Sequence, residues 1–217
     1  MERAALFGLA LFAVLLVAPP VLELVGAGYL TGLLIKAMLL AIAAISLDLL
    51  IGHGGMVSLG HAAFVAVGAY AAAIALDSGI ENILVLLAIT VGVTAVVAVI
   101  TGALALRTTG VYFLMITLAF GQMIFFTLSS LAAYGGDDGL TLWSMATLFG
   151  SDVVQNRGGL YFVILGTLFA AWWGVYRISQ SRFGRVLRAA RDNPQRAAFM
   201  GYNVTRYQQV AYGIAAM

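Results

Sequence analysis

The ten residues from Gly52 to His61 combine polar and flexible groups within an otherwise apolar part of the chain. They include four glycines, two histidines and Ser58. Each glycine costs a helix about 1 kcal/mol relative to alanine, so a continuous helix is disfavoured here. One interpretation is a broken helix that lines a polar pathway, with Ser58 capping a half-helix, because transporters build solute sites at such breaks. The other interpretation is an ordinary tight turn between two membrane spans, and the sequence leaves both open.

His53 and His61 are the two histidines of the chain, and they lie eight residues apart. The chain has no cysteine, and no carboxylate stands at a ligand spacing from either histidine. Zinc sites need three or four such ligands, so we predict no metal site. For His61 we expect a hydrogen bond to a neighbouring helix instead.

Lys36 and Asp48 are charged residues within one apolar stretch, and charges inside a membrane suggest function by default. Twelve residues of helix would separate them by about 18 Å along the axis, so they cannot pair within one straight helix. Lys36 can extend to the outer interface. Asp48 lies near the inner end and can reach water, although a proton-relay role for it stays open.

Seven of the eleven basic residues fall within residues 177–206, where Asp192 is the one acidic residue. Arg185, Arg188 and Arg191 repeat every three residues with apolar residues between them, which predicts a short amphipathic helix. Asp192 or Asn193 can cap a second helix with Pro194 in its first turn, and Gly201 suits the position after its end. The segment is therefore predicted to be a shaped docking element, or alternatively a basic loop that attracts anionic lipid.

The sequence contains no nucleotide-binding or catalytic motif that we can identify. No G-x-x-x-x-G-K-[ST] pattern occurs, and the neighbours of Lys36, the only lysine, do not fit one. No nucleophile stands beside a base in a recognisable arrangement. We therefore expect a protein that is not an enzyme and that binds no ATP, Mg²⁺ or other cofactor itself.

The composition indicates that lipid surrounds most of the chain. Hydrophobic residues make up 63% and charged residues 9%, with a mean hydropathy of +1.03, whereas soluble domains carry about 25% charged residues. The net charge of +2, without aromatic residues among the basic ones, does not favour nucleic acid. Strand alternation is absent, so spanning helices are the expected solution for the backbone polar groups.

Six apolar stretches have roughly the length of 20 residues that a spanning helix needs. They cover about residues 4–22, 28–51, 56–76, 82–106, 109–133 and 159–176, and a seventh begins near Tyr207 and stops at Met217. We predict an all-α polytopic membrane bundle with six complete spans and the start of a seventh, in one domain over 1–217 that is C-terminally incomplete.

The first stretch resembles a signal peptide, but Pro19 and Pro20 follow it, which favours a retained span. Ala62, Ala66, Ala69 and Ala73 form a smooth stripe suited to helix packing.

Basic residues predict the orientation, because they accumulate in short cytoplasmic loops. If residues 177–206 are cytoplasmic, Arg107 and Arg3 also fall inside, and most acidic residues fall outside. The N-terminus is then cytoplasmic, and residues 134–158 form an outer, periplasmic loop that opens with a turn at 134–140.

Four motifs in series resemble the permease subunits of bacterial ABC importers for branched-chain amino acids, specifically the second, LivM-like type of the two. They are SLGHAAF at 58–64 with GAY at 68–70, TGVYF at 109–113 with TLAFG at 117–121, GGDDGL at 135–140, and GRVLRA at 184–189 through RDN at 191–193 to Gly201. They follow the family's order across residues 45 to 213, so the resemblance is specific.

The resemblance implies a multi-pass protein of the bacterial inner membrane that pairs with a second permease subunit. It also implies two separate cytoplasmic ATPase subunits, which bind ATP and Mg²⁺, and a periplasmic substrate-binding protein facing the 134–158 loop. The residues at 185–201 would form the coupling segment that enters an ATPase cleft, with Arg185, Arg188, Arg191, Asp192, Asn193 and Gly201 as its key members. We expect the translocation pathway to involve Ser58, Gly60, His61, Phe64, Thr117, Phe120 and Gln122.

Two residues depart from the family pattern and keep other functions open. Asp48 stands where the family more often has asparagine, and His53 where it often has an aromatic residue. Close relatives carry urea or short amides, which the motifs do not separate from branched-chain amino acids. A proton- or sodium-coupled secondary transporter using Asp48 and His61, and a non-transporting membrane scaffold, are the rival hypotheses.

Overall fold

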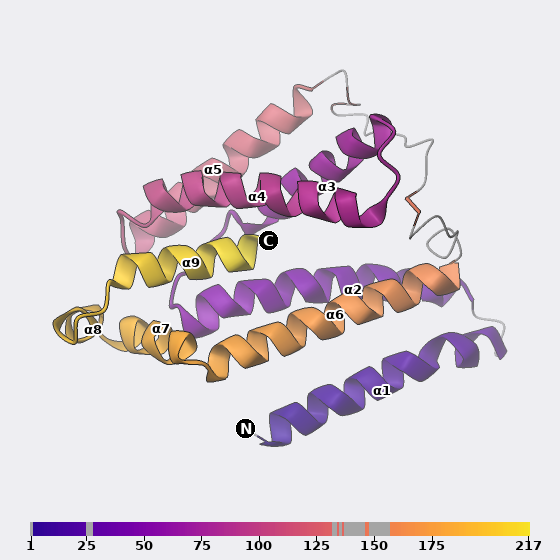
Figure 1. Ribbon diagram of the computed structural model, residues 1–217, viewed down its shortest axis with the longest axis horizontal. Helices are drawn as coiled ribbons and strands as arrows, with labels where there is room; N and C mark the ends of the chain where they lie inside the picture. The colour runs from indigo at the N-terminus through magenta and orange to yellow at the C-terminus, as the bar shows by residue number, and fades with distance from the viewer. Residues whose placement is uncertain (1, 25–27, 132–133, 135, 137–145, 148–156) are drawn as a thin grey trace.

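The regular structure of the protein is helical (Figure 1). The computed structural model describes residues 2–24, 28–131, 134, 136, 146–147 and 157–217. The elements are α1 (Glu2–Leu24), α2 (Tyr29–Asp48), a π-helical turn η1 (Leu49–His53), α3 (His61–Asp77), α4 (Ile83–Ala105), α5 (Val111–Ser129), α6 (Arg157–Gln180), α7 (Arg182–Asp192), α8 (Pro194–Phe199) and α9 (Val204–Ala216). Within these described ranges, the extended structure is an isolated bridge between Asn82 and Thr147. The predicted all-α membrane fold is confirmed.

The predicted number of complete membrane spans was too high for the described part of the chain. Four helices there are long and apolar enough to cross a membrane: Tyr29–His53, Ile83–Ala105, Val111–Ser129 and Gly158–Gln180. Gly8–Leu22 and His61–Asp77 are apolar but shorter. The span expected at 56–76 is short because residues 54–60 are not helical, so its helix begins only at His61. Helix α9 covers the expected start of a further span.

The helices form two groups that are joined by α9 (Figure 1). Helix α3 packs against α4 and α5, while α2 packs against α6 and α1 lies outside them. The Tyr161 hydroxyl on α6 donates a hydrogen bond to the Leu15 carbonyl on α1 at 2.6 Å. Helix α9 contacts both α4 and α2, so it bridges the two groups.

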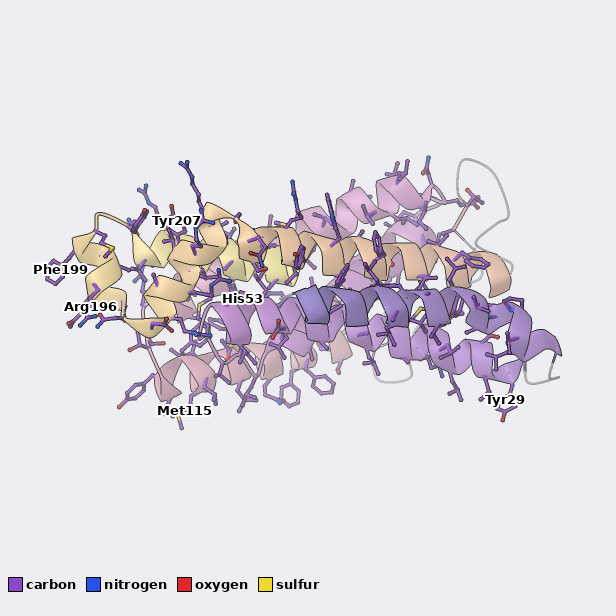
Figure 2. All side chains as sticks on the ribbon, turned by 90° about the horizontal axis from the view of Figure 1, so that it is seen from below. Tyr29, His53, Met115, Arg196, Phe199 and Tyr207 are labelled. Carbon is purple, nitrogen blue, oxygen red and sulfur yellow. The ribbon has the colours of Figure 1, made fainter. Side chains whose placement is uncertain are left out.

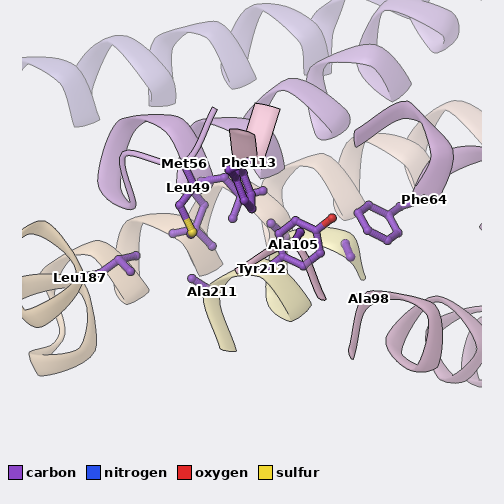
Figure 3. Close-up of a cluster of buried hydrophobic side chains, with 12 residues drawn as sticks. Leu49, Met56, Phe64, Ala98, Ala105, Phe113, Leu187, Ala211 and Tyr212 are labelled. Atoms are coloured by element: carbon purple, nitrogen blue, oxygen red, sulfur yellow. The ribbon is translucent and has the colours of Figure 1, made fainter. Parts of the chain in front are cut away.

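The central core lies where α9 meets the ends of α2 and α5 (Figure 3). Tyr212 of α9 is buried there, with its ring edge-on to Phe64 at 5.4 Å and to Phe113 at 6.4 Å between centroids. Leu187 of α7 and Met56 belong to the same cluster. The basic segment is therefore anchored to the bundle through an apolar face and is not a loose loop.

Local capping divides the basic segment as the sequence predicted. The Asn193 side chain accepts a hydrogen bond from the Arg196 N–H at 2.9 Å, so Asn193, and not Asp192, caps α8. Gly201 follows α8 with a φ of +85°, in the left-handed region that favours glycine. Ser181 and Asn203 cap α7 and α9 in the same way as Asn193 caps α8. These caps explain why α7, α8 and α9 are separate helices.

The predicted outer loop at 134–158 lies almost entirely outside the described residues. The same holds for the turn at 134–140, of which the structure describes Tyr134 and Gly136.

Candidate functional site

Residues 54–60 form a non-helical segment that enters the bundle beside α5. The Leu59 N–H donates to the Thr117 hydroxyl at 3.3 Å. Gly60 lies so close to the Thr117 carbonyl that a Cβ atom there would overlap it, and a Cβ at Gly121 would lie 3.3 Å from the Gly60 Cα. Thr117 is six residues into α5, about 9 Å along the helix axis. The segment is therefore a break between helices inside the bundle, and we call its contact with α5 the crossing (residues 58–60 against Thr117 and Gly121).

The polar groups at the crossing are buried and incompletely paired. His61 Nε2 lies 2.7 Å from the Ser46 hydroxyl on α2, which confirms the expected interhelical hydrogen bond. The predicted capping role of Ser58 was wrong, because Gly60 precedes α3 and makes no side-chain cap. Ser58 Oγ and His61 Nδ1 are buried without a hydrogen-bond partner among the described residues. Such orphaned groups are rare and call for a functional explanation.

Two hollows lie on either side of the crossing. The first, about 550 Å³, lies between α3 and α5, and Leu59 and Gly60 belong to its wall. We call it the outer hollow and the second the inner hollow, after the orientation that the sequence predicts. The inner hollow, about 670 Å³, includes Met56 and Val57 and is bounded by the α4–α5 connection, α7 and α9. Ser58 falls between the two sets of lining residues in the sequence. The two hollows share no lining residue, and the chain passes from the wall of one to the wall of the other at the crossing.

The structure brings the two predicted pathway segments together but exposes few of their side chains. Gly60 and Gln122 line the outer hollow. Ser58 and Thr117 are buried at the crossing, where Thr117 is only 1% exposed, and His61 is buried directly after it. Phe64 belongs to the central core. Phe120 is partly buried against the central core. Most of the predicted pathway residues are therefore packed at the crossing or in the core beside it, and do not line a hollow.

Sequence reasoning missed part of the wall of the outer hollow. Ala62 and Ala66, expected to pack against another helix, line this hollow together with Tyr70. The buried face of α3 instead includes Ala63, Phe64, Val67 and Gly68. An alanine stripe signals a smooth surface, but it does not indicate whether a helix or a cavity lies against it.

The predicted coupling residues differ in where they lie. Arg185 is exposed and donates to the Gln180 carbonyl at 3.0 Å, whereas Arg188 is half-buried. Arg191 reaches the bundle, where its Nη1 donates to the Gly52 carbonyl, and its Nε donates to the Asp192 carboxylate at 3.1 Å. Asn193 and Gly201 shape the ends of α8, as described above.

The outermost part of this segment carries two exposed apolar side chains that sequence reasoning did not select. Phe199 is 91% and Met200 74% exposed. Figure 2 shows Phe199 and Arg196 pointing away from the bundle, at the end opposite Tyr29. Exposed apolar groups among arginines are typical of a protein-binding surface. We call Phe199 and Met200 the α8 tip.

The two charged residues of α2 are both exposed, and neither belongs to the wall of a hollow. The Asp48 carboxylate lies beside Gly52, where a Cβ atom would be 2.6 Å from its Oδ1. Within the part of the chain that the structure describes, no three histidine or acidic side chains cluster as metal ligands.

The comparisons with known proteins agree on one family. Residues 29–217 match the family described as "Branched-chain amino acid transport system / permease component". The chain is 25% identical over 205 residues to the high-affinity branched-chain amino acid transport system permease protein LivM of Salmonella typhimurium, covering 82% of this chain and 48% of that protein. It thus spans about half the length of this curated relative. No solved structure matches the chain.

Proposed function

The chain belongs to the branched-chain amino acid transport system permease family, and on that premise we propose that it is a permease subunit of an ATP-driven importer for leucine, isoleucine and valine. It forms part of the translocation pathway in the bacterial inner membrane. A second permease subunit completes the pathway, a periplasmic binding protein delivers the amino acid, and two cytoplasmic ATPase subunits hold ATP and Mg²⁺.

The crossing between the two hollows is the observation that carries this proposal. Small-molecule sites occupy roughly 300–1,000 Å³ and have mostly apolar walls with a few polar groups. The outer hollow, at about 550 Å³, has this size, and its walls include Leu59, Ala66, Leu118 and Phe125. Such walls suit an aliphatic side chain better than urea or a short amide. Movement of the crossing would connect the hollows in turn and give Ser58 Oγ and His61 Nδ1 access to water or solute.

The shape of the basic segment supports its role as the ATPase-binding element. Helices α7 and α8 are anchored by Leu187 and present the α8 tip outward. An apolar tip that points away from the bundle can enter a cleft on a protein beyond the end of the spans, which favours the docking interpretation. The exposed apolar faces of the long helices are left to lipid and to the second permease subunit.

Co-purification tests the proposal directly. The tagged permease, expressed with its neighbouring subunits, should retain an ATPase subunit in detergent, and scrambling residues 185–201 should abolish this association. Phe199→Ser should weaken it strongly, because it removes the aromatic side chain of the tip, which is 91% exposed. Tyr29→Ser is the matched control, since Tyr29 is 71% exposed at the opposite end. The absence of any ATPase partner of the unaltered chain would refute the proposed function.

A further inference from the structure

Arg191 contacts the end of η1 and the beginning of the non-helical segment, and so links both to α7. Its guanidinium donates to the Gly52 carbonyl, and Asp192 accepts from the same guanidinium at 3.1 Å, which fixes its direction. The aliphatic part of the side chain lies across Gly55, where a Cβ atom would overlap Arg191 Cγ. Gly55 also has a φ of +66°, which favours glycine. One side chain of α7 thus contacts both ends of the turn at 52–55.

This turn is hydrogen-bonded to the residues just before it, so we expect residues 49–56 to move as a unit. The N–H groups of Gly54, Gly55 and Met56 donate to the carbonyls of Leu49, Ile51 and Leu50, at 3.2, 3.2 and 3.0 Å respectively. Leu187 of α7 packs in the same core cluster as Leu49, Leu50 and Met56. A displacement of α7 would be passed to residues 49–56 through this apolar contact and through Arg191.

The other end of the segment is bound to α5 at the crossing, only two residues after Met56. Leu59 is hydrogen-bonded to Thr117, and Gly60 contacts the α5 backbone. A shift of the turn at 52–56 must therefore either pull residues 58–60 along α5 or stretch the short connection at 57.

We propose that Arg191 is a positioning residue that transmits movement of α7 to the crossing, and that it does not bind the ATPase itself. This inference rests on the proposed function, because the movement would come from an ATPase bound at α8. Docking and transmission are then carried by different residues: the α8 tip contacts the partner, and Arg191 links the docked helices to the crossing.

Transport and ATP hydrolysis, measured together in proteoliposomes containing the whole importer, test the inference. We expect Arg191→Ala to keep the ATPase subunits bound and ATP hydrolysis active, while leucine uptake per ATP hydrolysed falls by roughly 5- to 150-fold, the usual range for coupling between sites. Arg191→Lys should recover part of the loss, because an ammonium can still donate to the Gly52 carbonyl. Arg182→Gln is the matched control, since it removes a charge from the first turn of α7, far along the helix from residues 52–60.

A distance measurement separates transmission from a merely structural role. The chain has no cysteine, so two introduced cysteines can carry spin labels at chosen positions. Val57 and Met123 are 44% and 63% exposed, on the segment and on α5 respectively. With Arg191 present, the distance between labels at these positions should change when ATP and vanadate are added. In the Arg191→Ala background, this distance should stay constant although the nucleotide still binds.

Each contrary result has a distinct meaning. Normal uptake per ATP in Arg191→Ala overturns the role of Arg191 and leaves the proposed function intact. The same follows if ATP and vanadate change the label distance in that variant as much as they do with Arg191 present. Loss of the ATPase subunits from Arg191→Ala would make the residue a docking residue and also overturn the inference. If the unaltered chain binds no ATPase, the proposed function and the inference fail together.

Discussion

The hydrogen bond between Ser46 and His61 determines the state of the imidazole at the crossing. The Ser46 hydroxyl has a single hydrogen, and it donates this hydrogen to the Ala43 carbonyl at 2.8 Å. The network therefore assigns the hydrogen of the imidazole to Nε2, which donates to Ser46. Nδ1 is then a buried acceptor that faces no donor among the described residues.

Ser46→Ala should destabilise the protein, because it leaves the His61 Nε2–H buried without an acceptor. The expected loss is about 1–3 kcal/mol, measured as the shift of the unfolding midpoint in detergent. Ser78→Ala is the control, since the exposed Ser78 hydroxyl bonds only to Ile74 in its own helix. Equal shifts for the two variants would show that the interhelical hydrogen bond adds no stability.

Asp48 separates the proposed function from a proton- or sodium-coupled transporter. Its exposed carboxylate lies at the end of α2, outside the walls of both hollows. We expect Asp48→Asn to retain ATP-driven leucine uptake within about twofold, because such surface substitutions usually change little. Uptake into energised vesicles, with and without ATP, measures this. Loss of uptake in the variant, together with uptake driven by an ion gradient alone, would favour the secondary transporter.

The crossing is a contact between two backbones, which makes glycine necessary at position 60. Gly60→Ala would place a Cβ atom against the Thr117 carbonyl, and a backbone atom of α5 cannot rotate away as a side chain could. We expect a loss of roughly 1–3 kcal/mol of stability, the usual cost of overpacking, and loss of uptake. Gly166→Ala on α6 is the matched control, because nothing lies within 4 Å of its Cβ position and alanine favours a helix. A fully active Gly60→Ala variant would show that the crossing is loose.

The elements that depend on local sequence could be predicted, and those that depend on tertiary contact could not. The break at Asn193 and Pro194 follows from capping and proline geometry within a few residues, and the structure confirms it. The start of α3 at His61 is different, because it depends on how residues 58–60 contact α5. The buried face of α3 was also unpredictable: lipid and protein neighbours both select apolar side chains, so hydrophobic periodicity does not distinguish the two faces.

The distribution of elements along the molecule predicts its orientation in the membrane. The start of α1, the η1 turn, the α4–α5 connection and α7–α8 lie toward one end, while the starts of α2, α4 and α6 lie toward the other (Figure 1). The first end carries Arg107 and the arginines of α7 and α8. Basic residues near the ends of spans are retained on the cytoplasmic side, so this end should be cytoplasmic.

Single-cysteine labelling tests this orientation, because the chain has no cysteine of its own. Tyr29→Cys and Ser78→Cys place an exposed thiol at one end, and Arg196→Cys places one at the other. In intact spheroplasts, a membrane-impermeant maleimide should label positions 29 and 78 but not 196, and all three should react after lysis. The reaction after lysis is the control for accessibility, since it shows that each thiol can be modified once the reagent reaches it. Labelling of position 196 before lysis would place α7 and α8 outside the cell, where no ATPase could bind them, and would contradict both the orientation and the proposed coupling.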